Sequence, residues 1–273
     1  MGRLAMIICA VVSLFAIFLA GCTQSHEMNT EACTLTTDNT TASDTAEGTL
    51  QCNTESKFEK KEHRADGIDI DYWLYTPKDA EKSMPLIVYL HGGSGRGGDL
   101  ELITAVDGFP QYLRDGKISP QAYVIIPQIP SSARGWAEMK KDIRLLILEV
   151  CREYMIDECR ISLTGHSMGG TGAWMLALSY PDVFAAVAPL SGSIALTDSN
   201  LEKLKVMSVW AVVGTDDKIV DPKSSTEFIS ELSKINENAR LTVLDGTDHF
   251  NVPNKAYLSA DIDIITWLIT QVK

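Results

Sequence analysis

Short apolar runs alternate with segments of helical periodicity from about residue 58 to the end of the chain. Residues 85–90 and 122–126 are continuous apolar runs followed by glycine-rich sequence or proline, which is typical of strands buried on both faces of a parallel sheet. Residues 69–75 alternate polar and apolar positions instead, which predicts a half-buried edge strand. Further strands are predicted at 160–163, 184–188, 206–213 and 240–244, and helices at 138–154, 171–179, 224–235 and 257–271.

The order of these segments predicts the class of fold. Strands separated by helices of this length form a mostly parallel, doubly wound α/β sheet with helices on its faces. About 17 residues separate the predicted strands at 184–188 and 206–213, which is too few for a cap domain at that point. The whole chain has 273 residues, enough for one hydrophobic core.

The amino-terminal segment has the pattern of an export signal rather than of a folded element. One charge, Arg3, precedes an apolar run over residues 4–20, which closes with Leu19-Ala20-Gly21-Cys22. This quartet resembles the bacterial lipobox, in which the cysteine is lipid-modified and becomes the first mature residue. We therefore expect 1–21 to be a lipoprotein signal peptide and Cys22 to carry the lipid, with an uncleaved transmembrane anchor as the alternative. Either way the rest of the chain lies outside the cytoplasm, tethered to the bacterial cell membrane.

The composition of the next segment predicts a stalk, and the net charge of the chain excludes one class of partner. Residues 22–56 are rich in Thr, Asp, Glu, Asn and Ser with few large apolar residues, which predicts a flexible stalk before the α/β domain at 57–273. The formal net charge of the chain is −12, whereas nucleic-acid binding needs a basic surface. The membrane contact expected is therefore the lipid anchor only, and no nucleic acid is expected as a partner.

The cysteines leave the redox state of the domain open. Export permits disulfides, and the pairs nearest in sequence outside the signal and lipid site are Cys151–Cys159 and Cys33–Cys52. We expect the Cys151–Cys159 pair to form a disulfide, with free buried thiols as the alternative. No paired-cysteine or histidine-rich spacing occurs, so we expect no metal and no other cofactor.

A candidate nucleophile stands between a predicted strand and a predicted helix. Gly165-His166-Ser167-Met168-Gly169 fits the pattern G-x-S-x-G, in which the serine occupies a sharp, strained turn and the flanking glycines avoid clashes with neighbouring backbone. The helix that follows points its amino terminus at the site, which favours developing negative charge. A glycine-rich turn whose serine only caps the helix is the alternative.

A glycine-rich loop follows the early buried strand, with the sequence Leu90-His91-Gly92-Gly93-Ser94-Gly95. Acyl transfer generates an oxyanion, and backbone N–H groups must already point at it. We expect one donor from Gly93 and the other from Met168, the residue after the nucleophile. A phosphate cradle would need GxxxxGK[ST] spacing, which is absent here.

The order of residues along the chain supplies a base and an acid. His249 is the only histidine downstream of Ser167, and a serine hydroxyl needs a base to take its proton. The acid that orients this imidazole is expected after the strand at 206–213, where Asp217 is our choice and Asp216 and Asp221 are the alternatives.

Other residues near these motifs are candidate substrate contacts. Gln128 and Trp136 follow the strand beside the glycine loop, and Trp136 either contacts substrate or covers the sheet edge. Gly92 lies in the loop itself. His166 is a further candidate contact, although its place in the sharp turn that carries Ser167, the nucleophile elbow, favours a packed, hydrogen-bonded residue. His91 is expected to brace the glycine loop.

Residues 68–270 resemble the α/β-hydrolase superfamily, and most of all compact bacterial esterases of the polyhydroxybutyrate-depolymerase, feruloyl-esterase and phospholipase/carboxylesterase-like groups. The matching segments are 72–77, 89–93, 164–170, 214–220 and 249–250. In such enzymes the acid of G-x-x-D-x-x-V matches Asp217.

The resemblance implies a serine hydrolase that cleaves a small-molecule or polymer-end carboxylic ester in an open cleft. A serine peptidase of the prolyl-oligopeptidase type, an acyltransferase, and a binding protein that lost the chemistry are the alternatives. The natural ester and the oligomeric state stay open.

Overall fold

The computed structural model describes residues 55–65, 68–106 and 108–273. The predicted signal peptide, the lipid site at Cys22, the Cys33–Cys52 pair and nearly all of the predicted stalk lie outside these residues. Within them, no helix is both long and apolar enough to cross a membrane.

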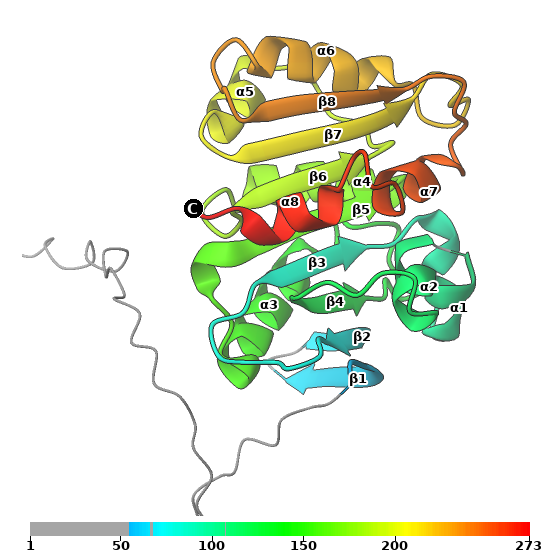
Figure 1. Ribbon diagram of the computed structural model, residues 1–273, viewed down its shortest axis with the longest axis vertical. Coiled ribbons are helices and arrows are strands. Elements are labelled where there is room, and N and C mark those ends of the chain that lie inside the picture. Colours follow the sequence, from blue (N-terminus) through cyan, green and yellow to red (C-terminus); the bar gives the residue numbers. More distant parts are fainter. Residues whose placement is uncertain (1–54, 66–67, 107) are drawn as a thin grey trace, which may run out of the picture. The chain divides into compact units, whose positions relative to one another are not determined.

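The described residues form one eight-stranded sheet in the order β1-β2-β4-β3-β5-β6-β7-β8 (Figure 1). Its first two pairings, β1 with β2 and β2 with β4, are antiparallel, and all the others are parallel. The mostly parallel sheet predicted from the sequence is therefore confirmed. The strands are β1 Lys57–Ala65, β2 Ile68–Thr76, β3 Leu86–Leu90, β4 Tyr123–Pro127, β5 Ile161–His166, β6 Ala186–Leu190, β7 Ser208–Gly214 and β8 Ala239–Leu244.

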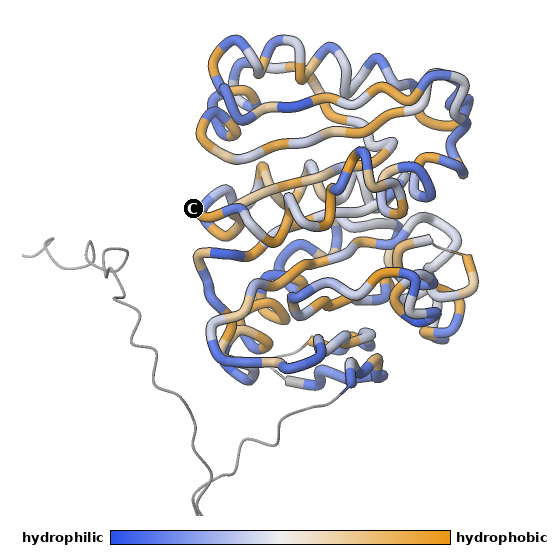
Figure 2. Tube along the Cα trace, viewed as in Figure 1, coloured by the Kyte–Doolittle hydropathy of each residue, from blue (hydrophilic) through white to orange (hydrophobic). Residues whose placement is uncertain are grey.

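Helices cover both faces of the sheet because alternate side chains of its central strands are buried on opposite sides. Leu86, Val88 and Leu90 of β3 join a core with α3, α4, α5 and α6, whereas Ile87 and Tyr89 join a second core with α1, α2, α7 and α8. In Figure 2 the hydrophobic positions run along the strands. The helices are α1 Glu101–Val106, α2 Gly108–Arg114, α3 Lys140–Tyr154, α4 Met168–Ser179, α5 Asp198–Leu204, α6 Lys223–Leu232, α7 Val252–Tyr257 and α8 Ile264–Thr270.

Two sequence-based expectations about elements are wrong. The strand predicted at the sheet edge, β2, lies inside the sheet because the charged strand β1 pairs along its whole length. The single closing helix predicted at 257–271 is two helices, α7 and α8. Asp263 separates them with a left-handed φ of 39°, and its side chain accepts a hydrogen bond from the N–H of Thr266 at the start of α8.

The expected disulfide between Cys151 and Cys159 is absent, and both residues are thiols. Cys151 is buried with the apolar face of α3 in the core, whereas Cys159 sits partly exposed in the 3₁₀ turn Glu158–Arg160, outside that core. The two side chains therefore occupy different environments. Burial raises the pKa of Cys151 to about 12, so its thiol stays neutral.

The register of the parallel strands aligns their carboxyl ends. Leu90 of β3 pairs with Gly165 of β5, and Gly214 of β7 pairs with Leu244 of β8. The segments that follow these strands carry the glycine loop, the serine turn, the acidic turn and the histidine loop. All four motifs therefore meet at one edge of the sheet.

Candidate active site

Ser167 occupies a strained turn between β5 and α4, with φ 59° and ψ −120°. A non-glycine residue rarely adopts this conformation, so the surrounding hydrogen bonds must impose it. The N–H of Ser167 donates to the carbonyl of Leu190 on β6, and its own carbonyl accepts from Thr171 one turn along α4. The turn thereby presents the Ser167 hydroxyl above the sheet.

The flanking glycines are required because the neighbouring backbone leaves no room for a side chain. A Cβ on Gly165 would lie 2.6 Å from the carbonyl oxygen of Leu90, and a Cβ on Gly169 would lie 1.8 Å from the same atom. Both distances are far below van der Waals contact. The two glycines of the G-x-S-x-G motif are thus required because β3 packs closely against the turn.

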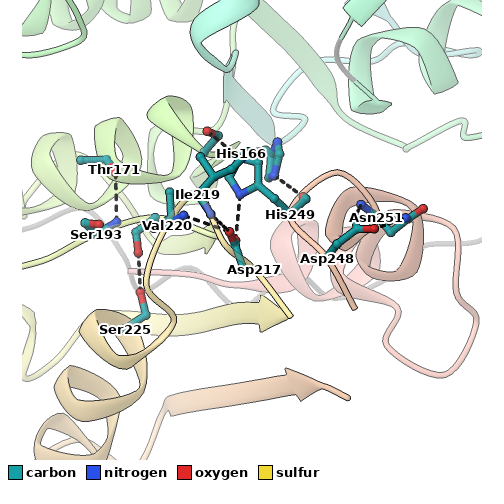
Figure 3. Close-up of polar contacts among 12 residues, drawn as sticks. His166, Thr171, Ser193, Asp217, Ile219, Val220, Ser225, Asp248, His249 and Asn251 are labelled. Atoms are coloured by element: carbon teal, nitrogen blue, oxygen red, sulfur yellow. Dashed lines mark hydrogen bonds and ion pairs between the residues drawn. The ribbon is translucent and has the colours of Figure 1, made fainter. Parts of the chain in front are cut away.

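Ser167, His249 and Asp217 form one chain of hydrogen bonds. Nε2 of His249 lies 2.8 Å from Oγ of Ser167, and Nδ1 of His249 lies 2.7 Å from Oδ2 of Asp217. Figure 3 shows the ring of His249 directed at Asp217 across the end of the sheet. Both His249 and Asp217 are buried. Because the carboxylate only accepts, Nδ1 carries the proton and Nε2 is free to take one from the serine.

The carboxylate of Asp217 is held in its ionised form. Burial by itself would raise the pKa of Asp217, but hydrogen bonds from the N–H of Val220, from His249 and from the N–H of Ile219 outweigh it and lower the pKa. The alternative acids Asp216 and Asp221 are both exposed. Of the three aspartates, Asp217 is the one that the structure places against His249.

The expected oxyanion donors lie on the two segments that flank Ser167. Gly93 begins the 3₁₀ turn Gly93–Gly95 and lines the pocket at the serine, and a Cβ there would meet nothing within 4 Å. Met168 is the first residue of α4, where backbone N–H groups have no acceptor within the helix. The positive end of the helix dipole adds to the attraction for an anion.

His91 braces the glycine loop from inside. Its Nδ1 lies 2.7 Å from the carbonyl of Gly92, and its Nε2 accepts from the N–H of Ile129 at 3.1 Å. These partners fix the neutral tautomer with the proton on Nδ1. Burial lowers the pKa of His91 to about 4, so this brace stays neutral at physiological pH.

Gln128 was a candidate substrate contact, and Trp136 was expected either to contact substrate or to cover the sheet edge. The structure places neither side chain in the pocket, which corrects the substrate-contact assignment of both. Each is buried and neither lines the pocket at Ser167. The amide of Gln128 donates to the carbonyls of Gly95 and Asp99, both at 2.8 Å, and the indole N–H of Trp136 donates to the carbonyl of His91 at 3.1 Å. Both side chains thus donate hydrogen bonds to backbone carbonyls of the glycine loop and of the residues that follow it.

The pocket at Ser167 has a volume of about 90 Å³. Two of the expected substrate contacts, Gly92 and His166, line it. The sequence interpretation missed its other wall, which comes from the short helices α1 and α2 and from the start of α7. The lining residues are Gly92, Gly93, Ser94, Gly95, Val106, Gly108, Tyr112, His166, Ser167, His249, Phe250 and Pro253.

His166 is buried beside the base, although it also lines the pocket. Its Nε2 lies 2.9 Å from the backbone carbonyl of His249, and the two imidazole rings are 4.6 Å apart. Burial, and next the nearby His249, lower the pKa of His166 to about 4. In the described part of the chain, no group of three or more His, Cys, Asp or Glu residues could hold a metal ion.

The sheet order, the turn after β5 and the helices on both faces define the α/β-hydrolase fold, as predicted. A thermostable esterase of known structure superposes with a TM-score of 0.65 and 25% identity, over 81% of this chain and 64% of that one. Residues 150–256 match the model of a family described as putative esterase.

Two relatives of known function match parts of the chain. Cutinase 1 of Thermobifida cellulosilytica is 36% identical over 106 residues, which is 37% of this chain and 37% of the cutinase. The bifunctional acetylxylan esterase/xylanase of Neocallimastix patriciarum is 24% identical over 176 residues, which is 61% of this chain and 24% of the relative. The chain thus spans well under half the length of these two relatives.

Proposed function

We propose that the protein is a serine hydrolase that cleaves carboxylic esters through an acyl-enzyme. The observation that carries this proposal is the unbroken hydrogen-bonded chain from Ser167 through His249 to Asp217 on a strained elbow. The esterase family model, the cutinase and the acetylxylan esterase support the same reaction class.

The geometry accounts for each step of this reaction. His249 takes the proton of Ser167 through Nε2 while the serine oxygen attacks the ester carbonyl, and Asp217 stabilises the imidazolium that forms. The oxygen of the tetrahedral intermediate becomes negative beside the N–H groups of Gly93 and Met168. His249 then returns the proton to the leaving alcohol. Water repeats the sequence on the acyl-enzyme, which releases the acid and restores Ser167.

The pocket favours an ester with a short acyl group. Its volume of about 90 Å³ is several times the space that a single water needs, which suits a small acyl group. Phe250 is 74% exposed and Val106 is 54% exposed at the pocket, so both offer apolar surface to the part of the substrate that stays outside. We therefore infer a small acyl group in the pocket, on a small molecule or at the end of a polymer.

Labelling with a fluorophosphonate and turnover of p-nitrophenyl acetate and butyrate test this function. We expect Ser167→Ala to lose both while its melting temperature stays close to that of the wild type. Ser193→Ala removes an exposed serine hydroxyl near the same edge of the sheet and should keep both activities. Equal turnover in wild type and Ser167→Ala would contradict the proposal. Faster cleavage of peptides, or transfer to added alcohols, would favour a peptidase or an acyltransferase.

We also propose that Cys22 carries a lipid that tethers the enzyme to the outer side of a bacterial cell membrane. The support is the lipobox-like quartet Leu19-Ala20-Gly21-Cys22 after an apolar run. Cys22→Ser should abolish incorporation of labelled palmitate and block cleavage after residue 21, whereas Cys159→Ser should change neither. Palmitate incorporation that survives Cys22→Ser would contradict the anchor.

A further inference from the structure

His249 has to reach its partner across a wide part of the sheet. Ser167 follows β5 and His249 follows β8, and β6 and β7 lie between these strands. Three strand spacings amount to about 14 Å. The loop that carries His249 therefore has to lean back over two strands and stay there, since the bond between Nε2 and the serine hydroxyl is only 2.8 Å long.

Hydrogen bonds tie the backbone of this loop to the ends of two strands, β7 and β5. The carbonyl of Thr247 accepts from the N–H of Asp216 at 3.0 Å, which fixes the loop to the end of β7. The carbonyl of His249 itself accepts from Nε2 of His166 at 2.9 Å, which fixes it to the end of β5. His166 immediately precedes the nucleophile, so one residue links the backbone of the nucleophile to the backbone of the base.

The chemistry of His166 suits a permanent donor. A carbonyl oxygen only accepts, so the proton of neutral His166 must lie on Nε2. The side chain is 8% exposed, and its ring packs against the ring of His249 with centroids 4.6 Å apart. The donor is therefore confined by packing and is aimed at one acceptor.

We propose that His166 is a positioning residue that holds His249 over Ser167 by donating Nε2–H to the backbone carbonyl of His249. This inference rests on the proposed function, because it assigns His166 to the base of that reaction. It develops the expectation that His166 is a packed, hydrogen-bonded residue, and it differs from the alternative in which His166 binds substrate. A positioning residue acts on the rate of the chemical step, whereas a substrate contact acts mainly on KM.

Two substitutions of similar polarity separate these roles. In His166→Gln the amide nitrogen takes the place of Nε2 and keeps the donor, and in His166→Asn the shorter amide cannot reach the carbonyl. Misplacing a reacting group by about 1 Å costs up to about 100-fold in rate. We expect His166→Asn to lower kcat for p-nitrophenyl butyrate about 10- to 100-fold with little change in KM, and His166→Gln to restore most of the loss.

Ser162→Ala is the matched control for lost stability. Ser162 lies on the same strand and is also buried, and its hydroxyl donates to a backbone carbonyl, that of Leu268, at 2.6 Å. The control should lower the melting temperature and leave kcat unchanged. If His166→Asn fails to fold, the His166→Gln and His166→Phe variants provide the same contrast between a kept and a lost donor.

A readout that needs no turnover separates failure of this inference from failure of the proposed function. The proton on Nδ1 of His249 is protected from exchange, and so visible by NMR, while the ring is held on Asp217. We expect this signal to persist in His166→Gln and to broaden or vanish in His166→Asn. A raised KM with unchanged kcat, or an unchanged NMR signal in His166→Asn, would overturn the inference. A wild type inert to both esters and fluorophosphonate would overturn the proposed function, and the NMR comparison would still decide the role of His166.

Discussion

An Asp217→Asn substitution replaces one oxygen and isolates what the carboxylate does for His249. Oδ1 of Asp217 accepts hydrogen bonds from the N–H groups of Ile219 and Val220, both at 2.9 Å, and Oδ2 faces His249. An asparagine keeps the two backbone bonds only if its carbonyl oxygen faces them. The opposite orientation would leave each donor unpaired at a cost of about 1–3 kcal/mol. The NH₂ group of the asparagine must therefore face Nδ1 of His249.

That orientation puts the proton of His249 on the wrong nitrogen. The NH₂ group only donates, so Nδ1 has to accept and the proton moves to Nε2, the atom that lies 2.8 Å from the hydroxyl of Ser167. The imidazole then takes no proton from the serine, and the imidazolium loses its counter-charge. We expect kcat to fall about 10⁴-fold, which corresponds to about 5 kcal/mol of transition-state stabilisation.

Hydrolysis of p-nitrophenyl butyrate measures this loss, with Asp216→Asn and Asp221→Asn as controls. Both control residues are exposed and lie within four residues of Asp217 in the chain, so each control substitution removes one charge while leaving Asp217 and His249 in place. The controls should stay within about threefold of wild type, because exposed charges contribute little. An Asp217→Asn enzyme that retains about a tenth of the wild-type kcat, or a larger loss in either control, would refute the reasoning.

Acid should destabilise the fold through His91 and His166, two buried histidines whose pKa values burial lowers. The pKa of His91 and of His166 is about 4 in the folded state and about 6.5 in the unfolded chain. The unfolded chain therefore binds protons first as the pH falls. Stability is lost between about pH 6.5 and pH 4, by up to about 3 kcal/mol for each group. Urea unfolding across this range should show the loss, and the double variant His91→Gln/His166→Gln should show a shallower slope; identical slopes would count against it. Gly169→Ala should lower the unfolding free energy by about 3 kcal/mol, because its Cβ would lie 1.8 Å from the carbonyl oxygen of Leu90, whereas Gly93→Ala has open space and should melt like the wild type. Thermal melts of the two variants decide this, and equal melting temperatures would contradict it.

The elements that the sequence predicts well are those whose constraints are local. β3 and β5 are short runs buried on both faces, so their apolar character is visible without knowledge of their neighbours. The elbow can be recognised in the sequence because its glycines are required where backbone segments approach too closely for any other residue. The candidate triad residues follow from chain order as well, since Ser167 comes directly after β5 and the loops after β7 and β8 carry Asp217 and His249.

The elements that the sequence misses depend on partners far along the chain. β1 is rich in charged residues, and what holds it is pairing with β2 and the stacking of Phe58 on Trp73 at 4.6 Å. Helices α1 and α2 have six and seven residues, too few for a periodic pattern to emerge. Because they were missed, so was the pocket wall at Val106, Gly108 and Tyr112. Tyr112 also hydrogen-bonds Asn254 of α7, a contact that no local pattern reveals.

Gln128 and Trp136 show that polar side chains next to a glycine loop can be needed by the loop itself. Gln128 and Trp136 stand after a buried strand at the functional edge, where polar side chains commonly face a cleft. Loop carbonyl groups that are turned away from water, however, need donors of their own. Gln128, Trp136 and His91 supply donors to the carbonyls of His91, Gly92, Gly95 and Asp99. A loop held by its carbonyls cannot turn its peptide groups over, so its N–H groups keep a fixed direction before any substrate arrives. In this protein the residues that look like substrate contacts thus hold the loop that carries Gly93, the proposed oxyanion donor.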